Sequence, residues 1–248
     1  MKILNILWGF GSGGIGKCFL TYNRLGESCE GINVHSVCID IRNRTYDRTA
    51  LHQNNIDIIS ISNPLDLSWI SQLKKRIQTF RPDILFSHGF NGPVVGWVVK
   101  RVFKIQTPLV CSYHGAYHPP TKLKTILAPI YNYVQPWVYR STAERVITVE
   151  NQSRKVLISK GVPERKLTTV FNGIPEKNIQ TNNNKHNDTA IKLLIASRLD
   201  KIKGIDYALK SLPEVLNKTS KPIKLYILGE GPENDNLRSI TNKLGLKD

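Results

Sequence analysis

The chain has 248 residues, 40% of them hydrophobic, and its 35 Lys and Arg against 19 Asp and Glu give a formal net charge of +16. Length and composition are typical of a folded globular protein with one or two domains. The charge predicts an anionic partner, and because no RNA-binding signature, zinc-finger spacing or basic tail accompanies it, we expect acidic lipid or a phosphorylated substrate and no nucleic acid.

The chain opens with an apolar strand, Ile3–Trp8, then a glycine-rich loop, Gly9–Cys18, and a helix from about Ile15 to Leu25. Glycine runs after a first strand are common in α/β proteins, and this one admits more than one interpretation. With Gly11, Gly13 and Gly16 it matches a dinucleotide fingerprint.

In that first interpretation, Asp40 at the end of the next strand would hold a ribose hydroxyl. A second interpretation, Gly11-x4-Gly16-Lys17, is a near match to a P-loop, but Cys18 stands where Ser or Thr would hold magnesium. A third depends on the family resemblance described below.

Apolar patterning then predicts an alternation of strands and helices. The expected strands are 33–40, 56–61, 81–88 and 108–113, and the expected helices are 68–80 and 94–102. In the first of these helices, Lys74, Lys75 and Arg76 are expected on a solvated face, with phospholipid contact as the alternative.

Two of the strands end at a histidine followed by a glycine, at His88 and at His114. A single histidine is more often structural than functional. Because parallel strands end at the same edge of a sheet, two such histidines favour a functional site at that edge.

The segment Thr121–Arg140 combines Lys122 and Lys124 with several Tyr, Trp and aliphatic residues. This composition suits an interfacial membrane contact, and it also suits a core helix of the N-terminal domain. The two interpretations can hold together.

A strand at 145–149, a helix at 153–160 and a strand at 167–170 complete the first predicted domain. The polar, unpatterned stretch after Pro175 is expected to be a linker. We therefore predict an N-terminal domain over residues 1–178, a linker over 179–190 and a C-terminal part over 191–248.

The C-terminal part begins with Ile191–Ala196, a near-continuous apolar run that predicts a parallel strand buried on both faces. A basic loop, Ser197–Gly204, leads into a helix at 205–217, a strand at 223–228 and a glycine turn at 229–232. A right-handed crossover places both loops at the ligand edge of the sheet. Arg198 and Lys203 are suited there to hold a diphosphate.

Cysteine usage and hydropathy exclude further classes of protein. The four cysteines form no CxxC pair and no metal-ligand spacing with histidine, so we expect reduced thiols and no metal site. The first eight residues are too short for a signal peptide, and no apolar run reaches the roughly 20 residues of a membrane span. We expect a cytoplasmic protein, with the inner face of a membrane as a peripheral contact.

The stretch Ala196–Gly204, followed at the next strand by Leu228–Pro232, resembles the donor-side signature of glycosyltransferase family 4. This resemblance implies an α/β, GT-B-like fold with two Rossmann-like domains. It implies a retaining glycosyltransferase that moves a hexose from a nucleotide diphosphate sugar to a glycan or lipid-linked acceptor, in cell-surface polysaccharide or lipopolysaccharide biosynthesis.

The resemblance also implies roles for individual residues. Arg198 and Lys203 would stabilise the departing diphosphate, and His114 would orient the donor sugar. Further substrate contacts are expected at Gly13, Gly14, His88, Asn172, Gly229, Glu230 and Gly231. For His88 the implied role is a contact with the acceptor, and Gly13-Gly14 would let bare backbone approach phosphate and acceptor. No metal or other cofactor is expected, because two cations serve the diphosphate.

The chain departs from the family pattern near its end. No Glu-x7-Glu motif, which in the family grips the ribose and the transferred sugar, follows the helix expected at 233–244. We therefore expect a chain truncated within its C-terminal domain. The alternative function is an inactive fragment that binds acceptor or anionic membrane through its basic N-terminal domain.

Overall fold

The computed structural model describes residues 1–11, 13–41, 49–115, 122–173 and 190–246. The chain folds as two compact units, residues 1–175 (unit 1) and 176–248 (unit 2). The predicted linker over 179–190 lies outside the described residues except for its last position, and so does the predicted boundary at 178.

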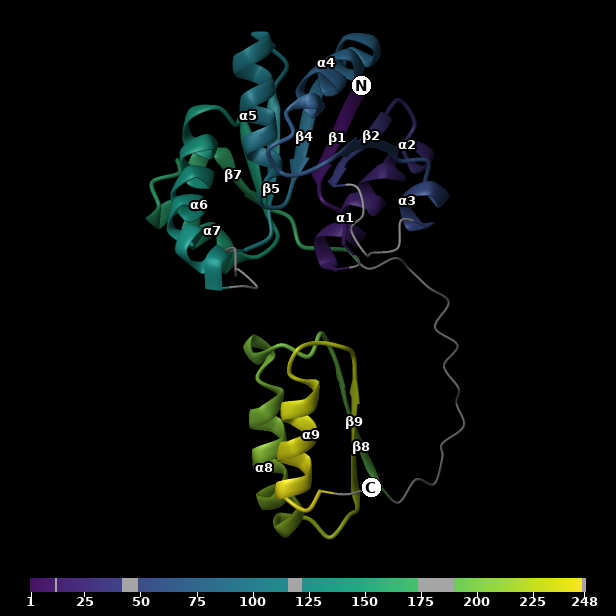
Figure 1. The fold of residues 1–248 in the computed structure, drawn as a ribbon, viewed down its shortest axis with the longest axis vertical. Coiled ribbons are helices and arrows are strands. Elements are labelled where there is room, and N and C mark those ends of the chain that lie inside the picture. Colours follow the sequence, from purple (N-terminus) through teal and green to yellow (C-terminus); the bar gives the residue numbers. More distant parts are fainter. Residues whose placement is uncertain (12, 42–48, 116–121, 174–189, 247–248) are drawn as a thin grey trace. The chain divides into compact units, whose positions relative to one another are not determined.

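Unit 1 is built on a seven-stranded sheet in the order β3-β2-β1-β4-β5-β6-β7, in which every pairing is parallel (Figure 1). The strands are β1 Lys2–Trp8, β2 Asn33–Ile41, β3 Asp57–Ile61, β4 Ile84–His88, β5 Leu109–Tyr113, β6 Arg145–Thr148 and β7 Leu167–Thr169. The helices are α1 Gly14–Asn23, α2 Leu25–Ser28, α3 Thr49–Gln53, α4 Ser68–Phe80, α5 Gly92–Phe103, α6 Lys122–Ser141 and α7 Asn151–Ser159, and a 3-10 turn, η1, covers Glu164–Lys166.

Helices cover both faces of this sheet, as its apolar strands require. The main core lies on the side of α4 and α5 and includes Leu4, Leu85 and Leu109, all fully buried. A smaller core on the side of α1 is centred on Phe19. Across the described parts of the chain, no helix is both long enough and apolar enough to span a bilayer.

Unit 2 contains two parallel strands, β8 Ile191–Ala196 and β9 Ile223–Leu228, with helices α8 Ile205–Lys218 and α9 Asn234–Lys243 and a 3-10 turn, η2 Lys201–Lys203. Its core, formed by Leu199, Ile205, Leu209 and Leu237, lies between the helices and one face of the strands.

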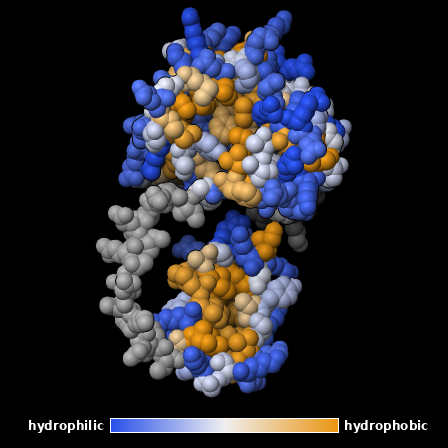
Figure 2. Space-filling model, turned by 180° about the vertical axis from the view of Figure 1, so that it is seen from behind, coloured by the Kyte–Doolittle hydropathy of each residue, from blue (hydrophilic) through white to orange (hydrophobic). Residues whose placement is uncertain are grey.

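The prediction that β8 is buried on both faces is wrong for this structure. Leu194 and its cross-strand partner Tyr226 are 63% and 45% exposed, and Leu228 beyond them is 57% exposed. Both helices cover the opposite face, so an apolar patch remains open on unit 2 (Figure 2). An apolar run shows that a strand can be buried but does not supply the elements that cover it.

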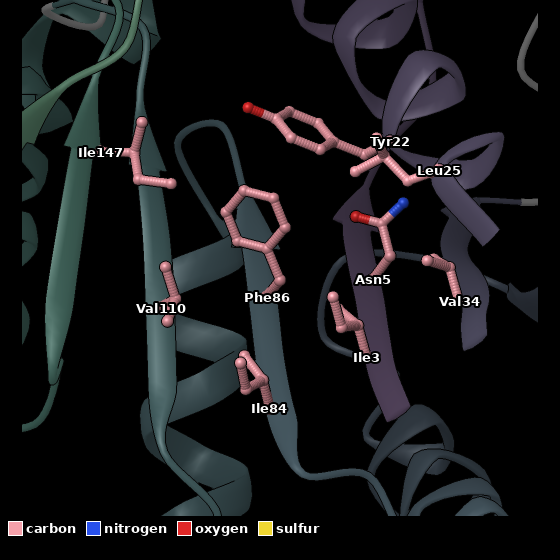
Figure 3. Close-up of a pocket in the computed structure, with 9 residues that line it drawn as sticks. All are labelled: Ile3, Asn5, Tyr22, Leu25, Val34, Ile84, Phe86, Val110 and Ile147. Carbon is pink, nitrogen blue, oxygen red and sulfur yellow. The ribbon is translucent and has the colours of Figure 1, made fainter. Parts of the chain in front are cut away.

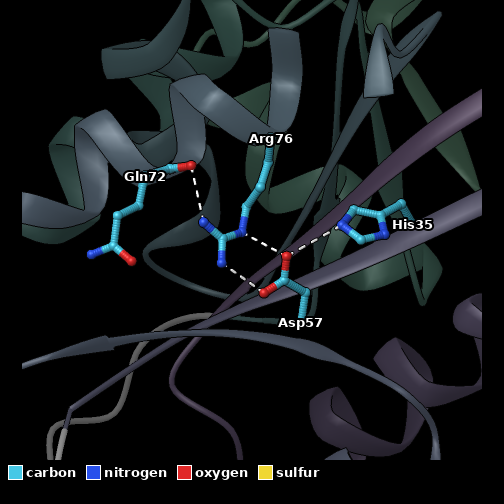
Figure 4. A network of polar contacts seen from close by, with 4 residues as sticks. All are labelled: His35, Asp57, Gln72 and Arg76. Carbon is cyan, nitrogen blue, oxygen red and sulfur yellow. Dashed lines mark hydrogen bonds and ion pairs between the residues drawn. The ribbon is translucent and has the colours of Figure 1, made fainter. Parts of the chain in front are cut away.

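Arg76, predicted on a solvated face of α4, pairs with a carboxylate of the sheet instead. Arg76 forms a two-pronged hydrogen bond with Asp57 of β3, with Nε–Oδ2 and Nη2–Oδ1 distances of 2.6 and 2.7 Å (Figure 4). His35 of β2 lies 3.4 Å from the same carboxylate. Burial alone would raise the pKa of Asp57, but the hydrogen bond and charge of Arg76, with a smaller effect of His35, lower it below its ordinary value.

A carboxylate whose pKa is lower in the folded state stabilises the fold above its unfolded pKa of about 3.9, and this contribution is lost as pH falls through the folded value. We expect Asp57→Asn to lower the free energy of unfolding at pH 7 by about 1–3 kcal/mol. This difference from the unmodified protein should become progressively smaller below pH 4. Urea unfolding followed against pH measures both. Glu164→Gln, which removes an exposed ion pair with Arg154, is the control and should change little. A deficit for Asp57→Asn that does not change with pH would contradict the assignment.

Candidate functional site

The carboxyl edge of the unit 1 sheet carries the glycine loop and the two histidines. The strand order reverses direction between β1 and β4, and ligands of open α/β sheets bind at such a switch point. The loop after β1 and the end of β4 meet there, since a Cβ added at Gly89 would lie 3.4 Å from Ile15 at the start of α1.

The glycines of this loop serve different purposes. Gly16 is buried, and a Cβ there would lie 2.0 Å from the Gly11 carbonyl oxygen, so the fold itself requires glycine. Gly13 and Gly14 are exposed at the N-terminus of α1, and a Cβ on either would meet no described atom within 4 Å. The fold does not require glycine at these two positions, which leaves bare backbone open to a ligand.

The structure weighs against the other interpretations of the loop. Asp40 is fully buried within β2, so its carboxylate is not presented to a ribose. Cys18, at the position that binds magnesium in a P-loop, donates to Asn172 Oδ1 at 3.2 Å, and burial raises the pKa of its thiol. This contact brings Asn172, which is exposed, to the same edge as the glycine loop.

His88 and His114 are joined by one serine. Ser112 Oγ lies 2.9 Å from His88 Nδ1 and 3.0 Å from His114 Nε2. His88 is 1% exposed and also contacts Asn5 Oδ1 at 2.5 Å. A direct contact of His88 with an acceptor, implied by the family resemblance, has no support in this geometry because the ring is enclosed. His114, half-buried just beyond β5, is the histidine that reaches the edge.

Burial lowers the pKa values of both histidines. The pKa of His88 falls to about 3, mainly by desolvation and also by the nearby His114, and desolvation lowers the pKa of His114. Both rings are therefore neutral at pH 7.

Sequence reasoning missed Asn5 and Ser112, which hold His88. Ser112 pairs with His88 across β4 and β5, and Asn5 of β1 pairs with Phe86, two residues before His88, so both depend on strand register. A nearby cavity of about 170 Å³ has an apolar lining and lies toward the middle and amino ends of the strands, away from the ligand edge (Figure 3). Its lining is Ile3, Asn5, Tyr22, Leu25, Val34, Ile84, Phe86, Val110 and Ile147.

In unit 2, the basic loop and the glycine turn follow adjacent parallel strands and are hydrogen-bonded to each other. Leu199 N donates to Glu230 O at 2.8 Å, and Glu233 N donates to Leu199 O at 3.1 Å. Added Cβ atoms at Gly229 and Gly231 would lie 1.9 and 2.2 Å from the carbonyl oxygens of Ser197 and Leu199. Only glycine permits this close packing of the two loops.

The packed loops present cations at the start of α8. Arg198 is 70% exposed and is paired with Asp200, and the exposed Lys203 ends the η2 turn. Gly204, with φ of +65°, turns the chain from η2 into α8, where the Asp206 carboxylate accepts hydrogen bonds from the backbone N–H groups of Asp206 and Tyr207. The exposed guanidinium and ammonium suit a phosphate or diphosphate, which would compete with Asp206 for these N–H groups. Among the described residues, no group of three or more His, Cys, Asp or Glu is placed to hold a metal ion.

The two kinds of glycine in the unit 1 loop lead to a stability prediction. Gly16→Ala forces Cβ against backbone and should lower the stability of unit 1 by about 1–3 kcal/mol. Gly14→Ala, at the first residue of α1, should leave stability unchanged or slightly higher, because alanine is the better helix former. Thermal unfolding of the two variants measures the difference, and equal losses would contradict the division of roles.

Comparisons with known proteins agree with this geometry. The model of the family described as Glycosyltransferase Family 4 matches residues 22–178, and the model described as Glycosyl transferases group 1 matches residues 176–248. An uncharacterized glycosyltransferase of Methanocaldococcus jannaschii is 25% identical over 280 residues, which cover 100% of this chain and 67% of that protein.

Solved structures show the same fold at low identity. Anabaena HepE in complex with UDP and glucose matches with a TM-score of 0.69 and 18% identity, over 100% of this chain and 67% of that one. The lipopolysaccharide outer core galactosyltransferase WaaB matches with a TM-score of 0.61 and 15% identity, over 99% and 66%. The predicted α/β, GT-B-like fold is confirmed. The chain belongs to Glycosyltransferase Family 4, and it spans about two thirds of the length of the relatives it matches.

Proposed function

We propose that this glycosyltransferase moves a hexose, with retention of configuration, from a nucleotide diphosphate sugar to a glycan or lipid-linked acceptor of the cell surface. The observation that carries the proposal is the cationic loop pair of unit 2, in which Arg198 and Lys203 flank the start of α8. The complex of HepE with UDP and glucose, and the lipopolysaccharide in the name of WaaB, support the substrate classes.

In this proposal the diphosphate stays bound to unit 2 as it leaves the sugar. As the bond between the sugar carbon and the diphosphate oxygen breaks, the acceptor hydroxyl oxygen bonds to that carbon and its proton passes to the leaving phosphate. Until that proton arrives, negative charge accumulates on the leaving oxygen. Arg198 and Lys203 stabilise this charge, and the N–H groups at the start of α8 contribute once they exchange the Asp206 carboxylate for the phosphate. Arg198 must exchange its contact with Asp200 for the phosphate, or share itself between the two. Two cations and a helix N-terminus supply the charge that a metal would otherwise supply, so the proposal includes no metal or other cofactor.

The glycine turn and the glycine loop have separate roles. Gly229, Glu230 and Gly231 shape the diphosphate site by holding the basic loop in place. Gly13 and Gly14 leave backbone accessible to phosphate and acceptor, and Asn172 lies at the same edge of unit 1. His114 contacts the donor sugar from the end of β5.

Calorimetric titration of the full chain with UDP and GDP tests the diphosphate site. We expect saturable binding of at least one nucleotide, with Arg198→Ala weakening it by tenfold or more, since a charge-assisted hydrogen bond contributes about 1.5–3 kcal/mol. Lys218→Ala is the matched control, because it removes the same charge from unit 2 at the opposite end of α8.

Equal weakening by Lys218→Ala would show that the binding reflects net charge and not this loop. Binding that Arg198→Ala does not change would reject the assignment of the donor site.

A second candidate function is docking of unit 1 on an anionic membrane surface at the inner face of the cytoplasmic membrane. It rests on α6, where Ile130 and Tyr133 are 59% and 68% exposed one helical turn apart. Tyr133 lines a groove of about 290 Å³ with Pro129, Pro136 and the cations Arg140 and Lys160. Exposed apolar side chains beside cations are typical of interfacial contacts. This function is compatible with transfer to a lipid-linked acceptor and would also persist in an inactive chain.

Co-sedimentation with phosphatidylcholine vesicles, with and without an anionic phospholipid, tests this docking. We expect binding only with anionic lipid and a steep loss with added salt. Ile130→Ser with Tyr133→Ser should weaken binding at least about tenfold, because burying one such side chain contributes about 1.5–3 kcal/mol. Val102→Ser, which alters an exposed apolar residue of α5, should not. Equal effects would exclude α6 as the contact.

A further inference from the structure

A row of buried polar side chains crosses the unit 1 sheet beneath its ligand edge. Ser36 of β2, Asn5 of β1, His88 of β4 and Ser112 of β5 are each no more than 3% exposed. The strand order places them side by side, and successive members are hydrogen-bonded. The row ends at His114, just past β5. Buried polar groups need fixed partners, so the direction of each hydrogen bond can be worked out.

The side-chain amide of Asn5 determines which groups donate and which accept along the row. Its Nδ2 group lies 3.2 Å from the Phe19 carbonyl oxygen, which can only accept, and 2.8 Å from Ser36 Oγ. The amide therefore points its nitrogen toward Phe19 and Ser36. Its oxygen, Oδ1, faces His88 Nε2 at 2.5 Å and can only accept a hydrogen bond from that nitrogen.

The hydrogen bond to Asn5 also fixes the direction of the hydrogen bond between His88 and Ser112. The ring is enclosed by Phe19, Tyr22 and Phe86, whose ring centroids lie 4.2–5.9 Å away, and its low pKa keeps it neutral. A neutral imidazole has one N–H group, and His88 donates it to Asn5. Its other nitrogen is an acceptor, so Ser112 must donate its hydroxyl proton to it.

The single hydroxyl hydrogen of Ser112 is donated to His88, so Ser112 cannot donate to His114. Its oxygen accepts from His114 Nε2 at 3.0 Å, so that nitrogen carries the proton. Because His114 is also neutral, its Nδ1 is a bare acceptor. A bare nitrogen accepts from a hydroxyl but repels the oxygens of a phosphate.

We propose that Asn5, His88 and Ser112 are positioning residues that fix the tautomer of His114, so that its Nδ1 accepts a hydrogen bond from a hydroxyl of the donor sugar. This inference rests on the proposed function, which already assigns His114 to the donor sugar, and it adds the residues that fix the protonation of the His114 ring. The relay itself is a property of unit 1 alone.

Long-range 1H–15N spectra of the ¹⁵N-histidine-labelled full chain test the relay without any ligand. They distinguish protonated from bare ring nitrogens, and His88→Gln and His114→Gln assign the signals. We expect both histidines to show protonated Nε2 and bare Nδ1 between pH 7 and 8. A His114 ring that averages between its tautomers, or a His88 that titrates in this range, would overturn the relay.

Serine variants separate positioning from a general effect of burial. Ser112→Ala should leave His114 averaging between tautomers, and Ser112→Thr, which keeps the hydroxyl, should restore the fixed state. Ser87→Ala is the matched control, because Ser87 is equally buried in the same sheet but contacts Cys111 on the face away from the relay. An unchanged His114 spectrum in Ser112→Ala would overturn the proposal.

Titration with UDP and UDP-glucose tests the ligand. We expect UDP-glucose, but not UDP, to shift the His114 Nδ1 signal. Ser112→Ala should weaken UDP-glucose about twofold, the factor expected if the two tautomers become equally populated, and should leave UDP unchanged. If the ligand-free spectra show the relay but UDP-glucose does not shift His114, the hydroxyl contact is overturned and with it the sugar role of His114, while the diphosphate site of unit 2 is judged separately by the binding of UDP.

Discussion

Parallel pairing of every strand is the constraint on which the rest of the structure depends. Return crossings join successive parallel strands within each sheet, so the segments that leave the strands meet at one edge. This brings the glycine loop, Asn172 and His114 to one edge of unit 1, and Arg198 and Lys203 to one edge of unit 2. Residues far apart in the sequence thereby become neighbours, as the hydrogen bond of Cys18 with Asn172 shows.

The two units differ in how deeply they bury the polar side chains at and beneath the ligand edge. Unit 1 buries a row of them and satisfies each with a partner of fixed direction, which holds His88 neutral and enclosed. Unit 2 leaves its cations in solvent, where Arg198 can turn from Asp200 to a ligand. A sugar hydroxyl requires a rigid acceptor of known protonation, whereas a diphosphate requires charge and backbone donors. The division matches the roles proposed for the two units.

Sequence patterns predicted what depends on local chemistry. The helix at 68–80, the strand at 223–228 and the loop around Arg198 lie where periodicity and composition placed them. The relay could not be predicted, because it depends on the register between β4 and β5 and on burial that a single histidine does not reveal. The open face of β8 and β9 and the pairing of Arg76 with Asp57 were also missed. Both depend on what lies opposite a residue, and an apolar run or a basic triplet carries no such information.

A crystal structure of the full chain with UDP tests the central claim most directly. We expect the diphosphate of UDP to lie against Arg198, Lys203 and the start of α8, with the glycine turn at 229–231 unchanged. UDP bound through its phosphates at the loop after β1, away from Arg198, would contradict the donor site proposed here.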